Sequence, residues 1–369
     1  MIHYQRVSHI YWKVGDRSTY SKSQALIWAK GDISKISLYF FDDEWKDQKW
    51  CSRPIKSLET LIYERCLSLR NQSRHLCLWL SSGYDSVTIL NKFAKYHIPL
   101  DELCVLSRRE NDPEFPLARK IAQDFQHSHQ PGVKITEIHL DYNYHGSIYA
   151  QLDQDFILLP GFGTRFTKSI LPVMTHKSIN ALRLREDRSD RIDISGFDKP
   201  RLDLRDNRWY AMFPDTTIYD HAGSPLRGFW IDHDAFELYH AACWSVIDWF
   251  ESLPELDHDL VHRIQSNDPW YYPAWNLACG RDPVFNSYSH RSQGKYLFSH
   301  NVGSPDSTEF EKYWMRENVN IWNSYLSGVQ LIQNLISEHW TDITTPLTSH
   351  KVTISSQSHY LRDLRVKSE

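Results

Sequence analysis

One stretch of the chain limits the possible fold more than any other. Residues 76–80 read Leu-Cys-Leu-Trp-Leu, an apolar run that suits a buried strand, and a polar turn follows at residues 81–86. Apolar residues then recur at helical spacing to about Tyr96. A strand that leads through a small, hydroxyl-rich turn into a helix is how many α/β proteins bind phosphate. The turn and the helix N-terminus present unpaired N–H groups and a partial positive charge.

Strand and helix patterns alternate along the surrounding chain. Ser57 is suited to cap a helix over residues 58–71, and a further helix is expected over about 116–125. Strands are expected at residues 76–80, 103–106, 133–140 and 191–194. This order predicts an α/β fold with a doubly wound, mostly parallel sheet.

The flanking regions follow different patterns. Residues 1–55 are expected to form a small β-rich extension, whose strand at 36–41 covers one edge of the main sheet. The nucleotide-binding type of domain then spans residues 56–205, and residues 206–369 form a mainly helical C-terminal module.

Several features are expected within that C-terminal module. Its expected parts are a short hairpin from 209–213 and 228–231, a helix from Asp232 or Asp234 to about Phe250, one or two helices over 309–339, and a frayed tail from Arg362.

Composition and charge exclude several classes of protein. The net charge of −4 argues against a strongly electrostatic nucleic-acid binder. No run approaches the roughly 20 apolar residues that a membrane helix needs. The six cysteines include no C-x-x-C pair, so Cys77 and Cys104 are expected to pack in the core of a soluble protein in a reducing cytoplasm.

The turn at residues 81–86 resembles the S-G-G-x-D-S signature of the PP-loop family, the N-type ATP pyrophosphatases. Here it reads Ser81, Ser82, Gly83, Tyr84, Asp85, Ser86, so serine replaces the first glycine. If that position requires a positive φ, the site is strained or altered. The alternative is a Ser-Gly turn that only caps a helix.

The resemblance implies a binding site for ATP and Mg²⁺. Ser81, Ser82, Gly83, Tyr84 and Ser86 would hold pyrophosphate, and Asp85 would bind the magnesium ion that accompanies the nucleotide. A second turn follows the strand at 191–194, and parallel strands bring their carboxyl ends to one edge of the sheet. This turn would supply Ser195 and Gly196 as further phosphate contacts, Asp198 as a second metal ligand, and Lys199 and Arg201 as phosphate clamps. The alternative for Asp198, Lys199 and Arg201 is a solvated turn with a local ion pair. Ser107 lies where family members contact adenine, and Arg108 and Arg109 follow it.

Over a longer span the chain is similar to a group of bacteriophage proteins labelled as resembling phosphoadenosine phosphosulfate reductases. The similarity covers residues 58–86, 98–103 and 195–201. It implies nucleotide binding and, for a phage protein, the host cytoplasm. The catalytic cysteine motif of the true reductases is absent, which argues against sulfate reduction. The chain also resembles asparagine synthetase, but Ile2 stands where the amidotransferase form of that enzyme has a nucleophilic cysteine.

The leading hypothesis is therefore an AMP-forming enzyme of ligase or amidation type, which adenylates a carboxylate or carbonyl of an unidentified acceptor and releases pyrophosphate. One alternative is a nucleotide-binding or interaction module without turnover. Another is a transferase of sulfur or amine that modifies transfer RNA, which the acidic balance disfavours. His258 and His262 share one helical face, but no third zinc ligand is evident, so a solvated face is preferred.

Overall fold

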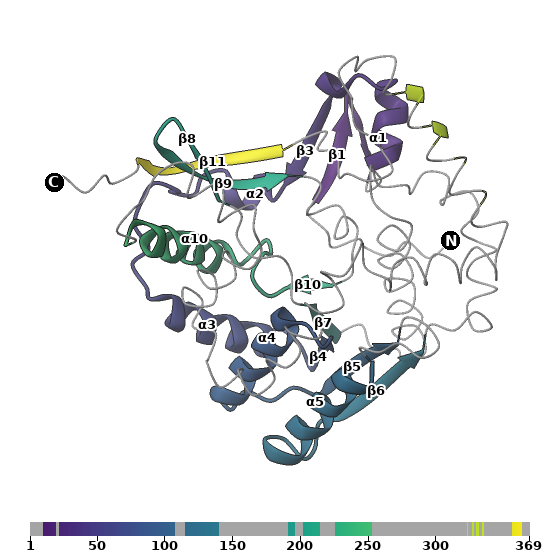
Figure 1. Ribbon diagram of the computed structural model, residues 1–369, viewed down its shortest axis with the longest axis vertical. Coiled ribbons are helices and arrows are strands. Elements are labelled where there is room, and N and C mark those ends of the chain that lie inside the picture. The colour runs from purple at the N-terminus through teal and green to yellow at the C-terminus, as the bar shows by residue number, and fades with distance from the viewer. Residues whose placement is uncertain are drawn as a thin grey trace, which may run out of the picture.

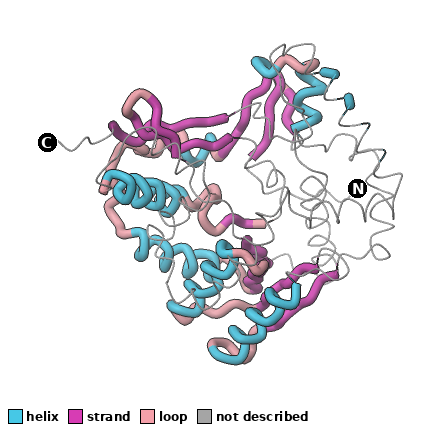
Figure 2. Tube along the Cα trace, viewed as in Figure 1, coloured by secondary structure: helices cyan, strands magenta, loops and turns pink. Residues whose placement is uncertain are grey.

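The structure is a computed structural model. It describes residues 10–19, 22–107, 115–139, 191–195, 202–214, 226–252 and 356–363, and single helical residues at 323, 327, 330, 331, 334 and 335. Figures 1 and 2 show how the described helices and strands are arranged. Among these residues no helix has the length and apolar character needed to cross a membrane.

A five-stranded parallel sheet forms the centre of the fold. Its strands are β4 (His75–Leu80), β5 (Glu102–Ser107), β6 (Lys134–His139), β7 (Arg191–Ser195) and β10 (Arg227–Gly228). They lie in the order β10-β7-β4-β5-β6, and every neighbouring pair is parallel. The expected α/β fold with a parallel sheet is thus confirmed. The strand order reverses at β4, which has β5 on one side and β7 on the other, and such a switch point is where ligands bind in open α/β sheets.

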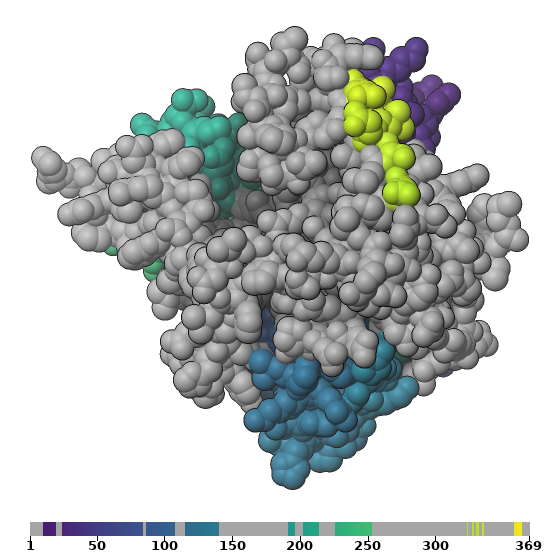
Figure 3. Space-filling view, turned by 45° about the vertical axis from the view of Figure 1, so that its right-hand side comes forward, coloured from purple at the N-terminus to yellow at the C-terminus, as the bar shows by residue number. Residues whose placement is uncertain are grey.

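Three helices accompany this sheet. They are α3 (Leu58–Asn71), α4 (Tyr84–Lys95) and α5 (Phe115–Ser128). The Ser57 hydroxyl accepts a hydrogen bond from the Thr60 amide, so the expected cap of α3 is present. Helix α4 packs on β4, and α5 packs on β5 and β6 (Figure 1). Figure 3 shows α5 and β6 together at the lower end of the face in view.

The two faces of the parallel sheet have different chemistry. Alternate residues of β4 and β5 (Leu76, Leu78 and Leu80; Leu103 and Val105) join the main hydrophobic core together with residues of α3, α4 and α5. The residues between them point to the other face, because side chains alternate along a strand. That second face carries His75, Cys77, Trp79, Glu102, Cys104, Thr136, Arg191 and Asp193. It is unusually polar for a parallel sheet, whose strands are ordinarily apolar on both faces.

Residues at the start of the chain form a separate antiparallel sheet. It contains β1 (Ile10–Val14), β2 (Arg17–Thr19) and β3 (Ile36–Phe40) in the order β2-β1-β3. Helix α1 (Lys22–Ala29), the 3-10 helix η1 (Ile33–Lys35) and the short helix α2 (Asp42–Trp45) accompany it. None of its strands pairs with a described strand of the parallel sheet, so it does not extend that sheet as an edge.

A third sheet joins distant parts of the chain. Strands β8 (Leu202–Arg205), β9 (Arg208–Pro214) and β11 (Ser356–Asp363) lie in the order β11-β9-β8 and pair antiparallel. Strand β3 lies beside β11, and the rings of Phe40 and Phe213 are 4.3 Å apart (Figure 1). The N-terminal sheet therefore packs on this third sheet through aromatic side chains.

Three expectations for the second half of the chain were wrong. Residues 209–213 do not form a hairpin with residues 228–231, because β9 pairs with β8 and β11 while β10 pairs with β7. Arg362 is not frayed but lies in β11, with its side chain ion-paired to Glu251. Helix α10 (Phe236–Glu251) begins after Ala235, so neither Asp232 nor Asp234 is its N-cap.

Candidate functional site

The turn between β4 and α4 is closed by its own two serines. The Ser86 hydroxyl accepts from the Ser81 amide and donates to the Ser81 carbonyl, both at 3.0 Å. The Ser81 hydroxyl lies 3.0 Å from that of Ser86 and accepts from the Gly83 amide at 3.0 Å. These bonds fix the path of the backbone from the end of β4 to the first turn of α4. Both hydroxyls are engaged inside the turn, so their main effect here is on its shape.

Replacement of the first signature glycine leaves the backbone of the turn unstrained. The described non-glycine residues with positive φ lie elsewhere, and Ser82 is not one of them. Gly83 itself has φ −76° and ψ 157°, an extended conformation open to any residue. A serine at position 82 is therefore compatible with the shape of this loop.

The N-terminus of α4 offers backbone donors. Gly83 is the N-cap residue, and no side chain caps the helix there. The first amides of a helix have no partner within it, and the helix dipole adds partial positive charge at this end. The amides of Tyr84, Asp85 and Ser86 stand in this first turn. The side chains of Tyr84 and Asp85 lie outside the described parts of the structure.

The ends of two neighbouring strands flank this turn. In the register of the sheet Leu80 pairs with Val105, so Ser107 follows at the carboxyl end of β5. Ile194 pairs with Leu78, which places Ser195 at the carboxyl end of β7. The Ser195 hydroxyl is buried and has no hydrogen-bond partner among the described residues, so they leave its hydrogen-bonding capacity unused.

Several predicted site residues cannot be placed in this way. Gly196, Asp198, Lys199 and Arg201 lie outside the described residues, as do Arg108 and Arg109. His258 and His262 also lie outside them.

A buried polar network on the second face of the sheet was not expected. The guanidinium of Arg191 contacts Glu102 at 2.6 Å and Asp193 at 2.8 Å. Trp79 donates to the same Asp193 oxygen at 3.0 Å, and His75 lies 2.8 Å from Glu102. A sequence signal existed, because Glu102, Arg191 and Asp193 are charged residues inside otherwise apolar strand patterns, and buried charges require partners.

Glu102 stays ionised despite its burial. Burial alone would raise the pKa of this carboxyl, but hydrogen bonds from Thr136 and His75 and the charge of Arg191 lower it to about 2. The side chain of Glu102 is 1% exposed. The network is therefore a fixed charge distribution near the amino ends of β4, β5 and β7, since His75, Glu102 and Arg191 are the first residues of these strands.

Cys77 and Cys104 are buried, as expected, but they are not surrounded by apolar side chains alone. Their sulfur atoms are 3.3 Å apart, and Cys104 also contacts Glu102. Burial, together with the neighbouring Cys104, raises the pKa of the Cys77 thiol.

Comparisons with known proteins add little to what this geometry shows. No model of a known protein family matches the chain, and no curated protein matches it. The resemblances to the PP-loop family and to the phage proteins therefore rest on their motifs. Among solved structures, an NH₃-dependent NAD synthetase from Campylobacter jejuni, in complex with a nitrate ion, aligns with 79% of this chain and 98% of its own. The two are 11% identical with a TM-score of 0.31, and a similarity of that size carries no argument about function.

Proposed function

We propose that this chain binds ATP at the turn between β4 and α4 and uses it to adenylate a carboxylate or carbonyl substrate. The observation that carries the proposal is the turn itself. It joins a buried parallel strand at the switch point of the sheet to an uncapped helix N-terminus, and it is held in shape by Ser81 and Ser86.

The proposed roles follow from what each group can offer. Backbone amides of Tyr84, Asp85 and Ser86, which follow the N-cap Gly83, face the phosphates, while Ser81, Ser82 and Ser86 set the shape of the loop and line it. Ser195 and Gly196 contact the same phosphates from the end of β7, which is supported by the unpartnered hydroxyl of Ser195. Ser107 borders the adenine.

The remaining roles rest on sequence. Asp85 and Asp198 would hold Mg²⁺, which screens the charge between phosphate oxygens. Lys199 and Arg201 would clamp the phosphates. These four are the proposed catalytic residues.

The proposed reaction has two steps. An oxygen of the acceptor attacks the α-phosphorus of ATP, the bond to the bridging oxygen breaks, and pyrophosphate leaves with that oxygen. A nucleophile then displaces AMP from the adenylated acceptor. Donors fixed before the reaction stabilise the charge that develops on the leaving pyrophosphate, which is where preorganised N–H groups act most strongly.

Product identity tests the proposal. The full chain is incubated with Mg²⁺, a pool of small-molecule acceptors and ATP labelled at either the α or the γ phosphate. We expect AMP and pyrophosphate as products in the wild-type chain. They should be lost in Asp85→Ala and retained in Ser68→Ala, a control substitution at a half-buried serine of α3. ADP with phosphate would exclude the mechanism. ATP binding without turnover would instead favour a nucleotide-binding or interaction module.

A further inference from the structure

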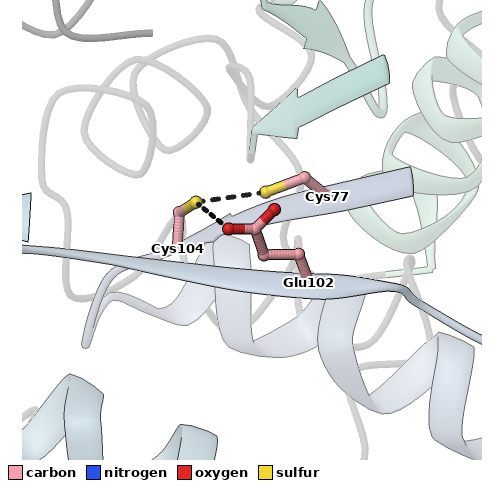
Figure 4. A group of neighbouring side chains, drawn as sticks. All are labelled: Cys77, Glu102 and Cys104. Carbon is pink, nitrogen blue, oxygen red and sulfur yellow. Dashed lines mark hydrogen bonds between the residues drawn. The ribbon is translucent and has the colours of Figure 1, made fainter. Parts of the chain in front are cut away.

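We propose that Cys77, Glu102 and Cys104 form a binding site for a thiophilic divalent metal ion of the Zn²⁺ class. The two sulfur atoms and a carboxylate oxygen lie within 4.8 Å of one another, on the polar face of the sheet (Figure 4). This site is separate from the turn at residues 81–86, and the proposal does not depend on the proposed function.

The sheet itself brings these donors together. Cys77 pairs with Glu102 across β4 and β5, and Cys104 lies two residues further along β5, on the same face. Figure 4 shows the three side chains directed toward one another. Because all three come from adjacent strands of the central sheet, the site is rigid, as a metal site with a defined geometry requires.

The distances between the donors are close to those of a tetrahedral site. Metal–ligand bonds of about 2.3 Å to sulfur and about 2.0 Å to oxygen place two sulfur atoms roughly 3.8 Å apart and sulfur and oxygen roughly 3.5 Å apart. The observed separations are 3.3 Å between the sulfur atoms and 3.7 Å from Cys104 to Glu102. Shifts of a few tenths of an ångström bring these two pairs to the tetrahedral values, and the Cys77 sulfur lies within 4.8 Å of a Glu102 oxygen.

The surrounding residues hold the donors in place. Thr136 donates to one oxygen of Glu102, while His75 and Arg191 contact the other. Arg191 also reaches Cys104 at 3.5 Å, and an N–H group directed at sulfur stabilises a thiolate. Orienting contacts of this kind are typical of the groups behind metal ligands.

The charge of the network permits binding. Glu102 and Asp193 oppose the buried guanidinium of Arg191, and the half-exposed ammonium of Lys134 lies 3.7 Å from Glu102, so two carboxylates face two cations and the network carries no excess positive charge. Binding replaces two thiol protons by one divalent ion, so the net charge of the site is unchanged and two protons are released. Arg191 is therefore compatible with the ion, because Asp193 and Glu102 offset its charge.

The burial of the three residues determines how the ion enters. Each is at most 1% exposed, so the ion would be taken up as the chain folds. Three protein donors leave the fourth position of a tetrahedral site for a further ligand, such as a water molecule taken up with the ion.

Cobalt substitution tests the site on the full chain. The protein is produced in minimal medium supplemented with Co²⁺ or Zn²⁺ and purified with a reductant. We expect about one metal ion per chain and, for the Co²⁺ form, a sulfur-to-cobalt charge-transfer band with the intense visible bands of a tetrahedral thiolate site. The bands should disappear in Cys77→Ser and Cys104→Ser. Cys66→Ser and Cys243→Ser alter buried thiols elsewhere and should retain them.

A second variant and a second measurement guard against loss of folding. Glu102→Gln keeps both thiols and should shift the visible bands, with circular dichroism as the folding control. In the Zn²⁺ form of the wild-type chain, blocking thiols with a mercurial should release the bound zinc. Wild-type protein with less than about a tenth of a metal ion per chain would overturn the proposal. So would bands that survive in both Cys77→Ser and Cys104→Ser, or peptide mapping that finds a Cys77–Cys104 disulfide in place of a metal.

Discussion

Removal of Arg65 tests how the segment before α10 is held to the parallel-sheet domain. The side chain of Arg65 is 4% exposed and contacts Asp232 at 2.8 Å and Asp234 at 2.6 Å. It also donates to the carbonyls of Gly228 at 2.7 Å and Phe229 at 3.1 Å. One residue of α3 thus binds four groups of a segment more than 160 positions away in the sequence.

The expected magnitude follows from what the substitution leaves behind. Taking one partner from a buried ion pair costs about 3–5 kcal/mol, because the other charge stays buried and unpaired. Here Arg227 still contacts Asp232 and Asp234, which places the cost toward the lower value. The two carbonyls each lose a hydrogen bond from a charged donor, worth about 1.5–3 kcal/mol. Taking the lower value for each loss, we expect Arg65→Met to lower the free energy of unfolding by about 6 kcal/mol.

Equilibrium unfolding in urea, followed by tryptophan fluorescence, measures this loss. Arg65→Lys keeps the charge but not the planar fork, so it should fall between wild type and Arg65→Met. Arg53→Met is the control, since Arg53 pairs with Asp248 at a side-chain exposure of 56%, and an exposed pair contributes at most about 1 kcal/mol. If Arg65→Met and Arg53→Met lost the same small free energy, the reasoning about this buried cluster would be refuted.

Three further predictions concern other features. Burial alone would raise the pKa of Asp232, but hydrogen bonding to His233 and the charges of Arg65 and Arg227 hold it well below its usual value. A carboxyl with a lowered pKa stabilises the fold above about pH 4 and loses that contribution as the pH falls further. The urea concentration at the unfolding midpoint should therefore fall in acid, and it should fall less steeply in Asp232→Asn. Ser86→Ala removes the hydroxyl that closes the turn, so ATP affinity measured by calorimetry should fall about 5- to 50-fold without loss of the fold; unchanged affinity would count against the proposed site. Trp45 is 1% exposed and packs against Phe40 and Phe213. Trp45→Ala should lower the free energy of unfolding in urea by about 3–5 kcal/mol, and a loss below about 1 kcal/mol would contradict the packing described.

Much of the central domain was predictable because its signals are local. The cap at Ser57, the start of α4 after Gly83 and the strands β4 to β7 depend on hydrophobic spacing and on a few turn residues. The turn at residues 81–86 was also recognisable, since its residues are contiguous. Sequence did not reveal that Ser81 and Ser86 bond to each other, which assigns their hydroxyls to the shape of the loop.

The pairing of distant segments was not predictable from spacing. Asp232 and Asp234 resemble helix caps in the sequence, yet they bind Arg65 and Arg227. Strand β9 has the alternation of a hairpin strand, yet it pairs with β11 about 150 residues later. The pattern of a strand indicates that it must pair with another strand, but it does not indicate which strand that is.

By itself, therefore, the sequence determined the helices and strands with regular apolar spacing, the parallel sheet of the central domain and the position of the turn at residues 81–86. These depend on interactions within a few residues, which the order of side chains already specifies. Only the tertiary structure brought Cys77 to Glu102 and Cys104, and Arg191 to both carboxylates. Those contacts join separate strands, and strand register, rather than local spacing, decides which side chains meet on one face of a sheet.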